Sequence, residues 1–230
     1  MLSLSTSFAT ICSARGADGY NPWQMTKRKP YHHSNLREVL LASAVRLIAE
    51  AGPGGFTLRE VARRAGVSHN APYRHFQDRD ALLAAVAAQG YLELNDAMLH
   101  AANQQSDPLI RLKRAGLAYV AFALRRPEHF TVMFETAAFS KELHPEAAAA
   151  SELAFSTLGN LVEACETTGQ MTPGDPLQLA LLAWTMVHGI AKLAITGRLP
   201  YRSRPKTLEF AEFVIENSLP GLRPVSASSD

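Results

Sequence analysis

The residues from Ser68 to His75 carry side chains well suited to reading a nucleic acid. The segment is short and polar and has little apolar surface to bury, which suits exposure in a DNA groove. Asparagine can form two hydrogen bonds with adenine, and a small apolar side chain can contact the methyl group of thymine. We therefore expect His69 and Asn70 to read base edges, and Ala71 to meet a thymine methyl.

Two short helices joined by a tight turn would present this segment to a partner. Thr57-Leu58-Arg59-Glu60 matches a capping box, in which the Thr hydroxyl accepts from the backbone of Glu60 and the Glu carboxylate reaches back. The helix that it opens ends at Gly66, where glycine lets the chain reverse direction. Ser68 can then cap a second helix that runs to about His75. Behind a longer first helix, this is the layout of a helix-turn-helix.

Charge is unevenly distributed along the chain. The net charge is +2, but residues 27–79 hold ten Lys/Arg against four Asp/Glu, while residues 80–230 hold twelve against sixteen. A basic N-terminal part and an acidic remainder are what a polyanion-binding domain attached to a soluble domain needs. The alternative is a chance unevenness of charge in a short segment. Lys27-Arg28-Lys29 and Tyr31-His32-His33 could form a basic arm along the DNA, or an untethered tail.

Apolar residues recur at helical spacing through most of the chain, and no segment shows the two-residue alternation of a strand. Asp78 and the Asp-Pro pairs at 107–108 and 175–176 predict helix starts, while glycines predict helix ends. We expect an all-α protein of about nine helices: a three-helix, helix-turn-helix domain and a larger C-terminal helical domain. The expected boundaries are a disordered or flexible arm over 1–30, the DNA-binding domain over 31–80, a ligand-binding and dimerisation domain over 81–222, and a flexible tail over 223–230.

The last two predicted helices are apolar on more than one face. Apolar residues wrap almost all round from Leu177 to Ala194, and they occupy two sides of the helix from about Lys206 to Leu219. A helix with two apolar faces needs two partners. The second partner could be the same helix pair of an identical subunit, giving a four-helix dimer interface. A wholly intramolecular core is the alternative.

Four segments between Leu36 and about Val86 form a specific pattern when their spacing is taken together. They are Phe56-Thr57-Leu58-Arg59-Glu60-Val61-Ala62, Ala65-Gly66-Val67-Ser68, Tyr73-Arg74-His75-Phe76 and Asp80-Ala81-Leu82-Leu83. This stretch resembles the TetR family of regulators. More thinly, Trp184-Thr185-Met186-Val187-His188-Gly189 and Arg126-Pro127-Glu128 resemble a TetR subgroup with a Trp-x-x-x-His-Gly signature. The resemblance implies a homodimer that binds double-stranded operator DNA and has a C-terminal ligand pocket, usually in a repressor.

The family pattern places phosphate contacts at Tyr73, His75 and Arg79, whose phenol, imidazole and guanidinium groups can donate to phosphate oxygens. Tyr73 could instead pack in the core, and His75 could be only a cation at a helix end. Arg59 can reach a phosphate or a base edge. Pro72 departs from the family pattern and leaves the phase of the second helix open. The residues expected to contact DNA are Thr57, Arg59, Ser68, His69, Asn70, Ala71, Tyr73, Arg74, His75 and Arg79.

The helices after Met98 hold many aromatic and thioether side chains, and small-molecule sites are mostly apolar with a few placed polar groups. Each such residue could instead be an ordinary core residue. His188 could be a satisfied buried histidine, and Gly189 could serve close packing in a dimer. The residues expected to bind an unidentified small-molecule effector are Phe122, His129, Met133, Phe134, Phe155, Trp184 and His188.

The sequence holds no HExxH, no Cys pair at metal spacing, no G-x-S-x-G and no phosphate-cradling glycine loop. We therefore expect no enzyme activity, no cofactor and no metal. Two widely separated cysteines, Cys12 and Cys165, favour a reducing cytoplasm, and no uninterrupted apolar run approaches the ~20 residues that cross a bilayer. No membrane partner is expected. The expected function is a ligand-responsive repressor that binds a palindromic operator as a dimer. The alternatives are a ligand-independent DNA-binding or architectural protein, an activator, or a small-molecule binder that has lost its DNA function.

Overall fold

The computed structural model describes residues 33–135 and 142–218. These two ranges form helices and connecting turns without any strand, which confirms the predicted all-α fold. The predicted arm over 1–30 and the predicted tail over 223–230 lie outside the described residues. In chain order the elements are α1 (His33–Ala51), α2 (Leu58–Ala65), the 3-10 helix η1 (Pro72–Arg74), α3 (Arg79–Asn103), α4 (Pro108–Arg125), α5 (Pro127–Glu135), α6 (Pro145–Thr167), α7 (Pro176–Ile195) and α8 (Arg204–Ser218).

Side-chain caps fix where several of these helices begin. The capping box at α2 forms as predicted: the Thr57 backbone N–H donates to Glu60 Oε2 at 2.8 Å, and the Glu60 N–H donates to Thr57 Oγ1 at 3.3 Å. The carboxylates of Asp78, Asp107 and Asp175 accept a backbone N–H in the first turns of α3, α4 and α7. Each cap satisfies a backbone donor that has no partner inside its own helix.

Glycines in the left-handed conformation follow four of the helices. Gly52, Gly66, Gly169 and Gly197 have φ values of 74°, 69°, 68° and 68°. A side chain with a Cβ rarely adopts this conformation, so glycine is favoured where the chain turns out of a helix. The prediction that glycines mark helix ends is therefore confirmed at these four positions.

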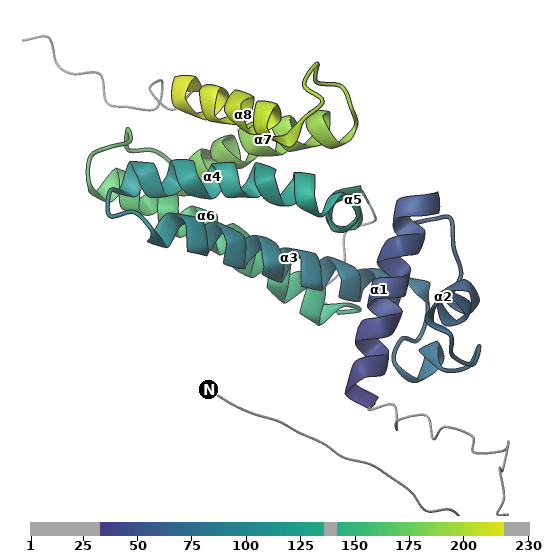
Figure 1. Ribbon diagram of the computed structural model, residues 1–230. Helices are drawn as coiled ribbons and strands as arrows, with labels where there is room; N and C mark the ends of the chain where they lie inside the picture. Colours follow the sequence, from purple (N-terminus) through teal and green to yellow (C-terminus); the bar gives the residue numbers. More distant parts are fainter. Residues whose placement is uncertain (1–32, 136–141, 219–230) are drawn as a thin grey trace, which may run out of the picture. The chain divides into compact units, whose positions relative to one another are not determined.

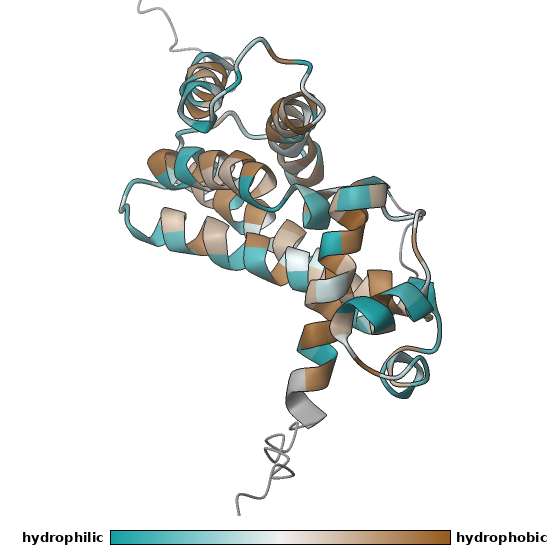
Figure 2. Ribbon diagram, turned by 45° about the vertical axis from the view of Figure 1, so that its right-hand side comes forward, coloured by the Kyte–Doolittle hydropathy of each residue, from teal (hydrophilic) through white to brown (hydrophobic). Residues whose placement is uncertain are grey.

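One continuous apolar core joins the described helices. Helix α3 packs on α4 and α6, and α4 also contacts α7 and α8 (Figure 1). Helix α1 packs on α2 and also contacts α3 and α5. The buried core runs without a break from Leu40 of α1 to Ile215 of α8. Figure 2 shows the apolar stripes on the faces that the helices turn toward one another.

The predicted second helix of the helix-turn-helix differs from the structure. Residues 68–71 form turns, and only one 3-10 turn, Pro72–Arg74, follows them. The N–H groups of His75 and Phe76 both donate to the Pro72 carbonyl at 2.9 Å. Because proline has no N–H, residue 72 cannot donate to the carbonyl of Ser68, and the continuous bonding of an α-helix is interrupted.

Candidate nucleic-acid interface and ligand cavity

The polar segment after α2 faces solvent. Across the described ranges, no protein group hydrogen-bonds to the side chains of Ser68, His69, Asn70 or Tyr73. Tyr73 is 51% exposed, so its ring does not pack as a core residue. These donors and acceptors are therefore available to an external partner. Seven of the ten predicted DNA-contacting residues are exposed, namely Thr57, Arg59, Ser68, His69, Asn70, Tyr73 and Arg74, while Ala71, His75 and Arg79 are half-buried.

Two buried residues hold this segment on the core. Pro72 is buried within the 3-10 turn, and Phe76 is 4% exposed just after it. The Arg37 guanidinium of α1 lies over the Phe76 ring at 5.7 Å, which adds a cation–π contact. Asp78 then caps α3. The segment thus projects polar side chains outward from a fixed base.

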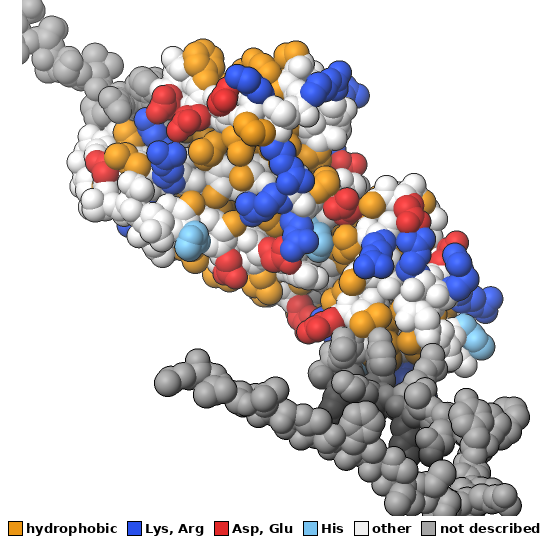
Figure 3. Space-filling model, viewed as in Figure 1, with side chains coloured by type: hydrophobic (Ala, Val, Ile, Leu, Met, Phe, Trp, Pro, Cys, Tyr) orange, Lys and Arg blue, Asp and Glu red, His pale blue; other side chains and the backbone are white. Residues whose placement is uncertain are grey.

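The basic residues near the segment differ in whether an acid neutralises them. Arg64 makes two hydrogen bonds to Glu50, at 2.7 and 2.6 Å, and these lower the pKa of the Glu50 carboxyl. Arg79 donates to the Gly54 carbonyl at 3.4 Å and lies 3.5 Å from Asp80. Arg59 and Arg74 have no acidic partner in the described part of the chain. Figure 3 shows Lys, Arg and His side chains gathered over α2 and the turn that follows it. Unpaired cations are what a phosphate backbone attracts.

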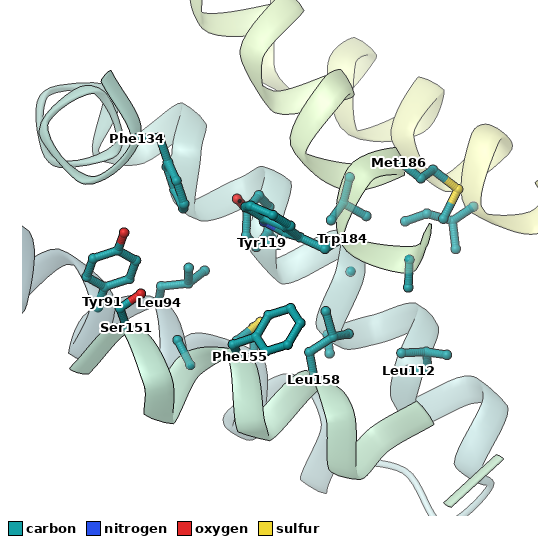
Figure 4. A pocket seen from close by; sticks show the side chains of 17 residues that line it. Tyr91, Leu94, Leu112, Tyr119, Phe134, Ser151, Phe155, Leu158, Trp184 and Met186 are labelled. Carbon is teal, nitrogen blue, oxygen red and sulfur yellow. Dashed lines mark hydrogen bonds between the residues drawn. The ribbon is translucent and has the colours of Figure 1, made fainter. Parts of the chain in front are cut away.

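A largely apolar cavity of about 240 Å³ lies among the helices of the C-terminal part (Figure 4). Residues of α3, α4, α5, α6, α7 and α8 all contribute to its wall. Within the described residues, no group of three His, Cys, Asp or Glu could hold a metal ion there or elsewhere. The lining residues are Tyr91, Leu94, Met98, Leu112, Ala115, Gly116, Tyr119, Phe134, Ser151, Ala154, Phe155, Leu158, Ala183, Trp184, Met186, Val187 and Ile215.

A hydrogen-bonded trio connects the cavity wall of α4 to α7. The Trp184 indole N–H donates to Tyr119 Oη at 3.1 Å, and Tyr119 Oη lies 2.9 Å from His188 Nδ1. Trp184 and His188 are four residues apart, so they share one face of α7 and meet Tyr119 together. Burial raises the pKa of Tyr119, whereas burial and then the charge of Lys192 lower the pKa of His188. Both side chains are therefore uncharged at neutral pH.

A second polar contact lies where α3, α5 and α6 border the cavity. The Tyr91 hydroxyl donates to the backbone carbonyl of Met133 at 2.8 Å. Burial raises the pKa of Tyr91, and a hydrogen bond from Ser151 opposes that rise. Figure 4 shows the side chains of Tyr91 and Ser151 at the same end of the cavity, away from Met186. The few polar atoms of the wall thus already have protein partners.

The residues predicted to bind an effector occupy different places. The cavity is lined by three of them, Phe134, Phe155 and Trp184. His188 is not part of the lining but contacts the lining residue Tyr119. Met133 contributes its carbonyl to Tyr91, and Phe122 is buried without being part of the lining.

His129 lies in a different environment. It is 3% exposed and borders an open groove among α1, α3 and α6 instead of the cavity. Neither of its ring nitrogens has a hydrogen-bond partner among the described residues. Its unpaired nitrogens make it an exception in a core whose other buried polar side chains are mostly bonded.

Three lining residues with hydroxyl groups, Tyr91, Tyr119 and Ser151, are absent from the sequence-based effector site. Tyr91 and Tyr119 lie at helical spacing from apolar residues such as Leu94 and Leu112, and this spacing indicates that both tyrosines face inward. It gave no signal that an unfilled space lies beside them, because packing between helices creates that space.

Apolar side chains of α7 and α8 also reach the surface. Leu182 and Leu193 are exposed on α7 and share a face with Gly189, where an added Cβ would meet no atom within 4 Å. Phe213 of α8 is 61% exposed. Apolar surface over these two helices is visible at the top of Figure 3. By length and composition alone α7 could cross a membrane, with a mean hydropathy of 1.4, but a single helix that is apolar on two faces is weak evidence of that.

Comparison with known proteins yields family matches in both parts of the chain. A sequence model described as bacterial regulatory proteins of the tetR family matches residues 40–86. A second model, described as tetracyclin repressor-like C-terminal domain, matches residues 112–217. Among curated proteins, the chain is 26% identical over 165 residues to the probable acrEF/envCD operon repressor of Escherichia coli K12, covering 69% of this chain and 74% of that one.

Two solved structures illustrate the structural similarity. A protein of unknown function from Rhodococcus sp. RHA1 superposes with a TM-score of 0.73 at 34% identity, covering 86% of this chain and 100% of that one. The transcriptional regulator FadR from Bacillus subtilis, in complex with stearoyl-CoA, superposes with a TM-score of 0.69 at 14% identity, covering 81% and 99%. The second likeness shows a shared fold.

Proposed function

The chain belongs to the TetR family of bacterial regulatory proteins, and we propose that it is a dimeric repressor that binds a palindromic operator and releases it when a small molecule fills the cavity. The observation that carries this proposal is the course of α3. Its first residue, Arg79, adjoins the exposed polar segment, and further along the same helix Tyr91, Leu94 and Met98 line the cavity. One continuous helix therefore links the two sites.

In this proposal the two parts of the chain have different functions. Residues 31–80 bind DNA, and residues 81–222 bind the effector and the second subunit. His69 and Asn70 read base edges, while Tyr73, Arg59 and Arg74 hold the phosphate backbone. The support is their exposure and their lack of protein partners in the described part of the chain. Phosphate contacts position the protein, and base contacts supply the sequence preference.

Effector binding and DNA binding are coupled through the distance between the two recognition segments, which are the Ser68–His75 segments of the two subunits. In a dimer, each segment enters a major groove, and successive grooves on one face of DNA lie roughly 34–36 Å apart. A molecule that fits between α3 and α7 favours one arrangement of α3 and thereby one separation of the recognition segments. The effector lowers operator affinity because it binds the arrangement of α3 that does not fit the operator more tightly than the arrangement that does. The size of this loss is set by the difference between the two effector affinities.

The dimer forms through α7 and α8, as a four-helix interface. Support comes from the exposed Leu182, Leu193 and Phe213 and from the open space at Gly189, which lets a partner helix approach closely. The Trp-x-x-x-His-Gly signature then has two roles. Trp184 and His188 hold Tyr119 on the inner face, and Gly189 serves the outer face.

The assignment as a repressor rests on the E. coli relative, which is named a probable operon repressor. The B. subtilis FadR structure contains stearoyl-CoA, but at 14% identity it does not indicate the effector of this protein. The chemical class of the effector therefore has to be inferred from the cavity of this chain. The protein acts as a soluble cytoplasmic regulator without enzymatic activity.

Fluorescence anisotropy of a labelled operator tests the proposal. We expect the full-length dimer to bind the protein's own upstream DNA, and at least one compound of a hydrophobic small-molecule library to release it. Binding that no compound alters would support a ligand-independent DNA-binding protein instead.

The variant Gly189→Glu tests the dimer separately by analytical ultracentrifugation. Glutamate favours a helix over glycine by nearly 1 kcal/mol, and the site is open within one subunit. We therefore expect a well-folded monomer whose operator affinity is about 100-fold lower, because the two recognition segments no longer bind together. Leu153→Glu, exposed on α6, is the matched control and should remain dimeric.

A further inference from the structure

We propose that the cavity takes an uncharged, largely apolar molecule of one or two fused rings and rejects anions such as carboxylates. This inference rests on the proposed function, in which the cavity is the effector site, and it names the chemical class of the effector. Four properties of the cavity carry it: its volume, the absence of charged lining residues, the engagement of its hydrogen-bond donors, and its aromatic walls.

The volume sets the size of the molecule. The cavity holds about 240 Å³. An apolar cavity of roughly 150 Å³ accommodates one benzene molecule, and drug-sized ligands occupy pockets of about 300–1,000 Å³. The space therefore fits a molecule larger than benzene and smaller than most drugs, such as two fused six-membered rings.

The wall offers no charge to an ion. None of the seventeen lining residues is an Asp, Glu, Lys, Arg or His. Three basic residues adjoin the lining in the sequence of α4, but none of them lines the cavity. Lys113 Nζ lies 3.9 Å from Glu216 and Arg114 lies 3.4 Å from Glu212, both on α8, while Arg111 donates to Asn103 Oδ1 at 3.3 Å. A carboxylate in the cavity would lose its hydration and gain no counter-charge, which strongly disfavours binding.

Hydrogen-bond donors in the cavity wall could stabilise a carboxylate in place of a counter-charge, but these donors already bond to protein groups. The Trp184 N–H donates to Tyr119, and Tyr119 also contacts His188. The Tyr91 hydroxyl donates to the Met133 carbonyl, and the Ser151 hydroxyl forms a hydrogen bond with Tyr91. A carboxylate can only accept hydrogen bonds, so it would have to break one of these contacts. An apolar molecule leaves all of them intact.

Aromatic side chains favour a ring over a flexible chain. Phe134 lies 6.1 Å from Trp184 between ring centroids, and Phe155 meets Trp184 edge-on at 6.3 Å. Figure 4 shows these rings, with Tyr119, around the same space. A planar aromatic molecule can make edge-to-face or offset contacts with several of them at once.

Calorimetric titration of the full chain at pH 7 with naphthalene and with naphthoate tests the charge preference directly. The two probes share a ring system and differ by one carboxylate. We expect naphthalene to bind and naphthoate to bind at least 100-fold more weakly. Naphthoate binding within threefold of naphthalene, or binding of neither probe, would overturn the inference. So would stearoyl-CoA binding more tightly than naphthalene.

Two cavity variants locate the binding. Ala154→Phe places a ring in the cavity and should abolish naphthalene binding, while Leu153→Phe, on an exposed position of the same helix, should leave it unchanged. Ser151→Lys adds a cation at the half-buried polar part of the wall and should raise naphthoate affinity at least tenfold. Equal naphthalene affinity in Ala154→Phe and Leu153→Phe would place the probe outside the cavity and contradict the proposal.

Operator anisotropy separates this inference from the proposed function. If naphthalene binds in the cavity but the operator stays bound, the repressor mechanism fails while the ligand class stands. If a carboxylate or a CoA thioester releases the operator through the cavity, the ligand class is wrong and the mechanism stands.

Discussion

The segment from Ser68 to His75 and the cavity beside Trp184 use polar side chains in opposite ways. In the segment, Asn70 and Tyr73 point polar groups into solvent without a protein partner in the described residues. In the cavity, the polar atoms of Trp184 and Tyr119 are bonded to each other. An external polyanion needs free donors, whereas an apolar effector needs a wall whose donors are already used. Substitutions in the segment should therefore change DNA binding, whereas substitutions around the cavity should change the stability of the protein.

The largest effect is expected inside the core. Phe130 is fully buried and packs on Tyr119, Phe134 and His188, with ring centroids 5.8, 4.8 and 5.3 Å away. Phe130→Ala should lower the free energy of unfolding by about 3–5 kcal/mol, because it opens a void in a packed aromatic cluster. Urea denaturation followed by circular dichroism measures this. Operator affinity of the folded protein should not change, and a loss in stability below about 1 kcal/mol would contradict the predicted contrast.

The next effect belongs to the exposed segment. Asn70→Ala should cost about 1–3 kcal/mol of discrimination between the operator and a sequence altered at the contacted base pair. Competition binding with the two DNAs measures the loss, and the melting temperature should stay the same. Asn160→Ala, exposed on α6, is the control. Unchanged base preference in Asn70→Ala would remove this residue from base reading.

Tyr73→Phe should have a smaller effect of a different kind. The variant removes one hydroxyl donor, so affinity should fall by about 1 kcal/mol for operator and unrelated DNA alike, because phosphate contacts carry no sequence information. Tyr201→Phe, a partly exposed tyrosine between α7 and α8, provides the matched control. A drop in thermal stability without a drop in affinity would assign Tyr73 to packing instead.

Local signals in the sequence predicted the helices well. The aspartates that cap α3, α4 and α7 and the glycines that end four helices act on backbone groups next to them, so their effects depend little on distant parts of the chain. The segment around Pro72 was harder to predict because two local signals conflict there: Ser68 favours a helix start, and Pro72 interrupts the helix four residues later.

The cavity was only partly predictable. Aromatic content indicated Phe134, Phe155 and Trp184, which do line it. Tyr91 and Ser151 lie sixty positions apart in the sequence and border the same space only because α3 packs on α6. Periodicity shows that a residue faces inward, but not whether the neighbouring helices fill the space in front of it.

The smallest predicted effect concerns His129, which belongs to neither site. Burial lowers its pKa below the ordinary value of 6.5, with opposing effects from Glu93 and Glu128 and a further lowering by Arg126. The unfolded chain therefore takes up a proton first as the pH falls, so the neutral ring contributes full stability above about pH 6.5 and loses it below. His129→Leu should show a shallower loss of stability between pH 7.5 and 5 in denaturation experiments. An equal slope in both proteins would contradict this.

Hydroxyl-radical footprinting on the DNA upstream of the protein's own gene tests the central claim most directly. A dimer that presents the Ser68–His75 segment of each subunit should protect two half-sites, centred roughly 34–36 Å apart on one face of the duplex. The protection should weaken steeply as salt rises, because binding releases counterions from the phosphates. A single protected patch, or protection that salt does not affect, would contradict the assignment of this segment as the DNA-reading element.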